Sequence, residues 1–155
     1  MWPPPPVGSV TIMRADLSNG VPGVTGPAPT TFDEFYAFYL SQHLHPMTRR
    51  SHVAGMTLGW MSAAAALLTG RPVLLAGLPL FGYAGAIPSH YIWEKNRPAS
   101  FLGVREFLWS IGCDLRQTIG FYSGRLDRDV EAVRQGLGLR PDQTTLADAP
   151  DLQAA

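Results

Sequence analysis

The four histidines of the chain are His43, His45, His52 and His90. Neutral imidazoles with a carboxylate suit iron(II), zinc or manganese, and an open set of three such ligands is typical of iron sites that activate oxygen. Glu94 follows His90 by four residues, so on a continuous helix the two side chains would share a face. A single histidine is more often a surface or structural residue. Glu94 could equally form an ion pair with Lys95 or Arg97.

Two apolar stretches must position these residues. Residues 53–69 contain no charged side chain, and the ionisable side chains of residues 73–93 are tyrosines and a histidine. A helix needs about 20 mostly apolar residues to cross a bilayer, with about 17 as the lower limit. Gly70-Arg71-Pro72 between the stretches predicts a turn, and small residues such as Gly55 and Gly59 allow close approach of two helices. The pattern favours an antiparallel transmembrane hairpin over a buried hairpin in a soluble bundle.

An antiparallel hairpin begins and ends at the same membrane face. His52 precedes the first apolar stretch and His90 lies near the end of the second, so we expect both, with His43 and His45 upstream, to gather there. Basic residues mark the same end, namely Arg49, Arg50, Lys95 and Arg97. Because Arg71 alone marks the opposite turn, the positive-inside rule predicts that the histidine end faces the cytoplasm.

The remaining segments predict an all-α protein in three parts. Residues 1–30 are rich in proline and glycine and are expected to be disordered. Residues 31–124 are expected to form a helical membrane domain. In it a first helix begins at Thr31 and is ended or kinked by Pro46, and residues 101–122 form one or two amphipathic helices that flank the hairpin. Residues 125–155 predict a charged helix followed by a polar tail.

Composition limits the kind of partner. Charged residues make up 15% of the chain, against about 25% in a typical soluble domain. Basic and acidic residues balance at 12 each, so we expect no nucleic-acid partner and instead a lipid bilayer. The single cysteine, Cys113, cannot form an internal disulfide and is expected to be a small buried residue.

Two segments resemble a known family. Residues 35–43, followed by Pro46, Arg49, Arg50 and His52, are one segment; the other is residues 89–101, in which a Glu-Lys-Asn-Arg-Pro-Ala run begins four residues after His90. Over roughly residues 32–113 the chain resembles the fungal and bacterial 2-hydroxy fatty acid dioxygenases. It departs from them at His45, where the family more often has Asn, and at Ser89, where it has Gly.

The resemblance implies an integral membrane protein that uses iron(II) and dioxygen to shorten a 2-hydroxy fatty acid by one carbon. The implied iron ligands are His43, His52 and His90, with His45 incidental or outside the ligand set. The candidate catalytic residues are Glu94 and Arg97, and the candidate substrate-binding residues are Arg49, Arg50 and Tyr91, with Tyr39 as a possible further donor. The arginines could instead anchor to anionic headgroups. The rival functions are a non-catalytic membrane scaffold or lipid-binding protein and a zinc-dependent lipid hydrolase.

Overall fold

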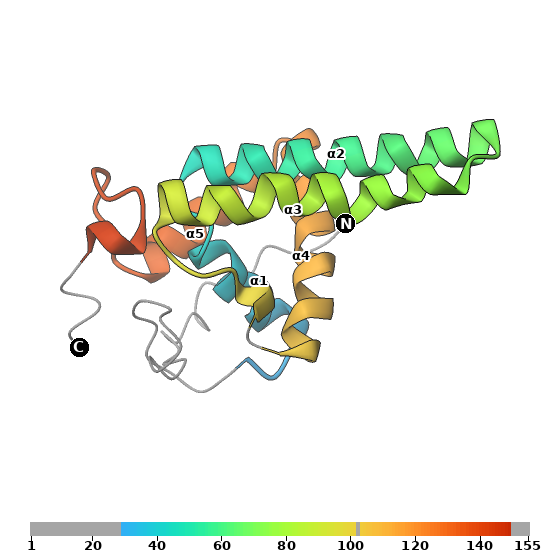
Figure 1. The fold of residues 1–155 in the computed structure, drawn as a ribbon. Helices are drawn as coiled ribbons and strands as arrows, with labels where there is room; N and C mark the ends of the chain where they lie inside the picture. Colours follow the sequence, from blue (N-terminus) through green and yellow to red (C-terminus); the bar gives the residue numbers. More distant parts are fainter. Residues whose placement is uncertain (1–28, 102, 150–155) are drawn as a thin grey trace.

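The structure is a computed structural model that describes residues 29–101 and 103–149 (Figure 1). The predicted disordered segment falls outside this range except for its last two residues. The long helices are α1 (Phe32–Ser41), α2 (Pro46–Thr69), α3 (Gly77–Ser89), α4 (Val104–Tyr122) and α5 (Leu126–Gly136). Shorter helical segments are Pro72–Ala76, His90–Glu94, Ala99–Phe101 and Leu146–Asp148. The described residues form helices and no strand, which confirms the predicted all-α class.

Helix α1 begins where the sequence predicts. The Thr31 side chain accepts a hydrogen bond from the Glu34 backbone N–H, and the Glu34 carboxylate accepts one from the Thr31 N–H. This reciprocal pair satisfies two backbone donors at the helix start. The prediction for Pro46 is wrong, because α1 already ends at Ser41 and Pro46 is the first residue of α2. Proline suits that position since its fixed φ is helical and it has no N–H to satisfy.

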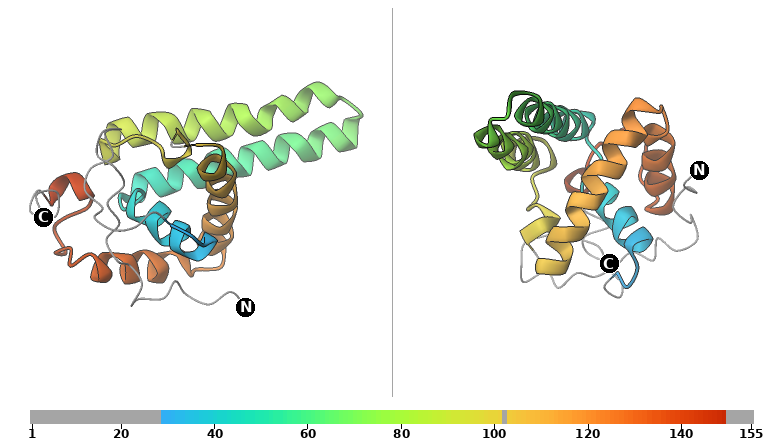
Figure 2. Two further views of the ribbon diagram at one scale, coloured as in Figure 1. Left: turned by 90° about the horizontal axis from the view of Figure 1, so that it is seen from below. Right: turned by 90° about the vertical axis from the view of Figure 1, so that its right-hand side faces the viewer.

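Helices α2 and α3 lie side by side and antiparallel, and their far end extends beyond the rest of the chain (Figures 1 and 2). Gly70 ends α2 with a φ of 66°, in the left-handed region that glycine adopts easily. The two helices approach closely at glycines. A Cβ on Gly55 would lie 2.5 Å from the Phe81 carbonyl oxygen, and one on Gly85 would lie 2.5 Å from the Ser51 carbonyl oxygen.

One helical stretch in the described part of the chain, Pro72–Glu94, is long and apolar enough to span a membrane. It combines a 3₁₀ turn, α3 and a π-helical turn into a run of 23 residues. Helix α2 does not meet the same criterion, so a pair of transmembrane helices is not confirmed. The exposed end of the pair is nevertheless apolar: Leu67, Leu68 and Val73 are 83%, 87% and 74% exposed.

The other helices form a core around α1. Residues 104–122 form a single helix, α4, where one or two were predicted. Helix α5 packs its apolar side on α1, and Cys113 of α4 is fully buried in this core, as predicted. The sequence predicted a polar tail after the charged helix. Over residues 140–149 this prediction is wrong, because Leu146 is buried in the same core. A capping box between Thr145 and Asp148 holds this segment.

The close approach of the helices at two glycines predicts that an added methyl group lowers stability there but not at an open glycine. Gly55→Ala and Gly85→Ala should each destabilise the protein by about 1–3 kcal/mol, because the new Cβ meets backbone that cannot move alone. Gly82→Ala is the matched control, since nothing lies within 4 Å of its Cβ position. That variant should be neutral or more stable by up to about 1 kcal/mol. Thermal unfolding in detergent measures the difference, and equal melting temperatures for all three variants would contradict the packing.

Candidate metal centre

Three histidine rings meet in the interior. His43 follows α1, His52 lies on α2, and His90 begins the π-helical turn after α3. They are 1%, 5% and 1% exposed. One ring nitrogen from each lies within 4.8 Å of the others. Their ring centroids are 4.5 Å apart for His43 and His52 and 4.6 Å apart for His43 and His90. The structure thus brings together the three histidines that the sequence indicates.

The Nδ1 atom of each ring lies at a different oxygen. His43 Nδ1 is 2.5 Å from the Tyr39 carbonyl oxygen, and His52 Nδ1 is 2.6 Å from Asp114 Oδ1. His90 Nδ1 is 2.7 Å from Asn96 Oδ1. A carbonyl or carboxylate oxygen can only accept, so in the neutral rings Nδ1 carries the hydrogen. The lone pair is then on Nε2.

The orientation of Asn96 is itself determined. Its side-chain NH₂ donates to the Gln42 carbonyl oxygen and to Gln42 Oε1, at 3.3 and 3.0 Å. Because both partners are acceptors, the amide nitrogen must point to Gln42 and the amide oxygen to His90. His90 therefore donates through Nδ1, as His43 and His52 do.

The second nitrogens fit a metal ion. The Nε2 atoms of His43 and His52 are buried and have no hydrogen-bond partner among the described residues. An unpaired buried polar atom costs about 1–3 kcal/mol, so these atoms need a ligand. Burial lowers the pKa of His43 well below its usual value, and the neighbouring histidines lower that pKa further, which keeps the ring neutral. Metal–imidazole bonds of about 2.0–2.1 Å place two tetrahedral ligands about 3.3–3.4 Å apart, so the three rings, whose nitrogens lie within 4.8 Å of one another, would move inward on binding one ion.

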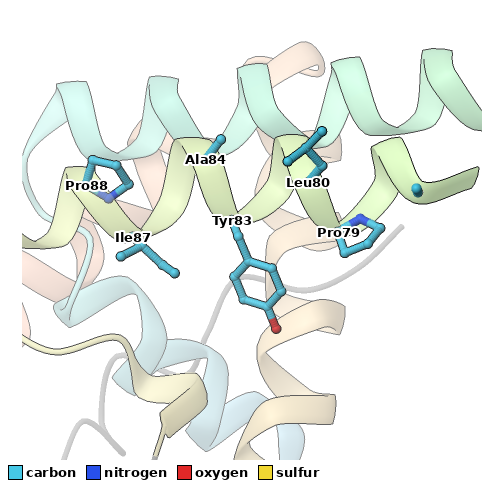
Figure 3. A pocket seen from close by; sticks show the side chains of 7 residues that line it. Pro79, Leu80, Tyr83, Ala84, Ile87 and Pro88 are labelled. Carbon is cyan, nitrogen blue, oxygen red and sulfur yellow. The ribbon is translucent and has the colours of Figure 1, made fainter. Parts of the chain in front are cut away.

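A cavity of about 380 Å³ adjoins the cluster. All three histidines line it, together with residues of α2, α3, the segment at Pro98–Ser100 and α4. Its other lining is mostly apolar and includes Met56, Trp60, Leu78, Ala86, Phe107 and Ile111. Figure 3 shows Tyr83 extending from α3 towards α4, with Pro79 and Ile87 on the same helix. These three residues also border a second, more open pocket along α3, so the helix lines both pockets.

Glu94 does not belong to the cluster. Its buried carboxylate accepts a hydrogen bond of 2.7 Å from the backbone N–H of His45, the residue just before α2. The turn from His90 to Glu94 is π-helical, and its two end residues have different partners: His90 joins the histidine cluster, whereas Glu94 bonds to the start of α2. The neighbouring His45 also serves α2: its Nδ1 accepts from the Met47 N–H.

The other predicted substrate-binding and catalytic residues do not face the cavity beside the cluster. Arg49 is buried and donates to the carbonyl oxygens of His43 and Leu44. Arg50, Arg97 and Tyr91 are exposed. None of these four predicted residues lines the cavity.

Two residues that position the cluster were not assigned from the sequence. Asp114 of α4 accepts hydrogen bonds from His52 and from the Tyr39 hydroxyl, the latter at 2.5 Å. In the sequence, Asp114 stands out as an acidic residue on a largely apolar side of its helix. The sequence alone does not show, however, that α4 packs against α2. Asn96 lies inside the family-like run after His90, where only Glu94 and Arg97 were singled out.

The His52–Asp114 contact predicts a specific effect on metal affinity. Asp114→Asn removes the charge that orients His52 and should weaken binding of Zn²⁺ by about 10–100-fold. Glu94→Gln is the control, because it neutralises another buried carboxylate that does not touch the three rings. Titration against a chromophoric chelator measures both variants. Equal losses for the two would show that Asp114 has no special role in the site.

Comparison with known proteins places the chain in a family. A family model described as 2-hydroxy-palmitic acid dioxygenase Mpo1-like matches residues 29–126. No curated protein and no solved structure matches the chain. The matched range contains the three clustered histidines and both Asn96 and Asp114. Since it covers well over half of the sequence, the chain belongs to the 2-hydroxy-palmitic acid dioxygenase Mpo1-like family.

Proposed function

We propose that this protein is an iron(II)-dependent dioxygenase that shortens 2-hydroxy fatty acids by one carbon. The observation that carries the proposal is a group of three buried histidines, two with unpaired Nε2 atoms, beside a mostly apolar cavity. The description of the family names both a dioxygenase and 2-hydroxy-palmitic acid, and so supports the reaction and the substrate class.

His43, His52 and His90 would hold the iron through Nε2. Bound there, iron(II) supplies the activation of dioxygen and open positions for the substrate's hydroxyl and carboxylate oxygens. The protein orients the three rings through the Tyr39 carbonyl, Asp114 and Asn96. Burial of the rings keeps bulk water from the reacting atoms.

The cavity would take the substrate. Its volume of about 380 Å³ lies within the range of small-molecule sites, about 300–1,000 Å³. Apolar side chains from three helices suit an acyl chain, and the histidine end suits the polar head. Arg49 and Glu94 are proposed to hold the start of α2 instead of acting on substrate, because their polar atoms are engaged there.

The proposed site of action is a membrane, with α2 and α3 inserted as a hairpin. The apolar run Pro72–Glu94 and the exposed leucines at the hairpin end support this placement. Arg50, Lys95 and Arg97 are exposed at the opposite end, where they would meet headgroups on the cytoplasmic side. A lipid substrate would then reach the cavity without crossing bulk water.

Reconstitution tests the proposed reaction. Detergent-purified protein loaded anaerobically with iron(II) should take up oxygen when given 2-hydroxypalmitate and should form pentadecanoic acid in proportion. His52→Ala and His90→Ala should reduce both signals to background, because each removes an iron ligand. His45→Ala, which removes a histidine outside the cluster, should retain most of the activity. An oxygen electrode and mass spectrometry of the products measure the two signals.

The possible failures separate the rival functions. Iron binding without oxygen uptake would contradict the dioxygenase. Release of a fatty acid from an ester with zinc and without oxygen uptake would indicate a lipid hydrolase. Absence of any histidine-dependent metal binding would leave a scaffold or lipid-binding protein.

A further inference from the structure

A fatty acid head group in the cavity needs hydrogen-bond donors, and the described lining contains no lysine or arginine. Apart from the histidines, Tyr39 and Asp114, the polar side chains of the lining are Trp60, Tyr83, Ser100 and Ser110. The Tyr39 hydroxyl already donates to Asp114. A side-chain hydrogen-bond donor for the bound carboxylate, in addition to the metal, would therefore come from these remaining polar residues.

Ser110 differs from the other serines and threonines of α4. It is 6% exposed, and its Oγ is buried with no hydrogen-bond partner among the described residues. Hydroxyl side chains in a helix commonly donate to a backbone carbonyl one turn earlier. Thr118 does so to the Asp114 carbonyl oxygen, and Ser123 at the helix end donates to that of Gly120. Ser110 alone of the three leaves its hydroxyl unused.

The position of Ser110 brings it near the metal centre. The cavity-lining residues of α4 are Phe107, Ser110, Ile111 and Asp114, with the spacing of a single helix face. Asp114 is one turn after Ser110 and is bonded to His52. Side chains four residues apart on a helix have Cβ atoms about 5–6 Å apart. Ser110 therefore lies on the cavity wall, one helical turn from the carboxylate that holds His52.

We propose that Ser110 is a substrate-binding residue whose hydroxyl donates a hydrogen bond to the carboxylate of the 2-hydroxy fatty acid. The inference rests on the proposed function and assigns to Ser110 a substrate contact of the kind that the sequence had suggested for Arg49 and Arg50. A neutral donor suits this place because Asp114 next to it already carries negative charge and offers acceptors only.

Binding without turnover tests the inference. Protein loaded with Zn²⁺ in place of iron is titrated calorimetrically with 2-hydroxypalmitate. Ser110→Ala should weaken binding about tenfold or more, the usual effect of losing a hydrogen bond to a charged group. Ser110→Thr, which keeps the hydroxyl, and Ser123→Ala, which removes one outside the cavity, should bind like the wild type. Hexadecane-1,2-diol, which lacks the carboxylate, should not distinguish Ser110→Ala from the wild type.

Zinc affinity and the melting temperature of each variant accompany the titration. Wild-type affinity for 2-hydroxypalmitate in Ser110→Ala would overturn the role of Ser110 and leave the proposed function intact. An equal loss of zinc affinity in that variant would also overturn it, since the residue would then be structural. A wild-type protein that forms pentadecanoic acid yet shows no such difference between variants would again contradict only the inference. A wild type that neither binds nor converts 2-hydroxypalmitate would overturn the proposed function itself.

Discussion

Three imidazole rings can be buried in contact with one another only if the rings stay neutral and every N–H finds an acceptor. In this protein three separate parts of the chain meet that requirement: a carbonyl of α1, a carboxylate of α4 and an amide after the π-helical turn. Because each acceptor takes a hydrogen bond from Nδ1, it also determines that Nε2 keeps the lone pair. The packing of α1, α2, α3 and α4 around the cluster therefore holds the rings neutral, with the Nε2 lone pairs available to a metal.

Close packing of α2 on α3 brings His52 and His90 together. Gly55 and Gly85 let the two backbones approach, and the charged residues near the histidines secure the base of this pair. Glu94 accepts from the backbone N–H of His45, the residue before α2, while Arg49 donates to carbonyl oxygens that follow α1. In the sequence both residues are candidates for catalysis or substrate binding, yet in the structure each satisfies buried backbone groups. Removing either side chain would leave a buried backbone group without its partner, which is costly.

Local signals and topology made part of this structure predictable. The capping box at Thr31 is contained within four residues, and the gathering of His52 and His90 follows from the reversal at Gly70. The role of Asp114 was not predictable, because it depends on how α4 crosses α2. The π-helical turn at His90 was likewise not predicted, and Glu94 at its end bonds to the His45 backbone instead of joining the histidine cluster. The prediction of a helix end at Pro46 failed because proline is suited both to following a helix and to starting one.

X-ray absorption at the iron edge tests the central claim most directly. Full-length protein is loaded anaerobically with one equivalent of iron(II), and the scattering from imidazole rings is counted. The account predicts three imidazoles on one iron, with the remaining positions filled by light oxygen ligands, and the same spectrum for His45→Ala. Iron surrounded by oxygen ligands without imidazole scattering would contradict the claim that the three buried histidines form a metal centre.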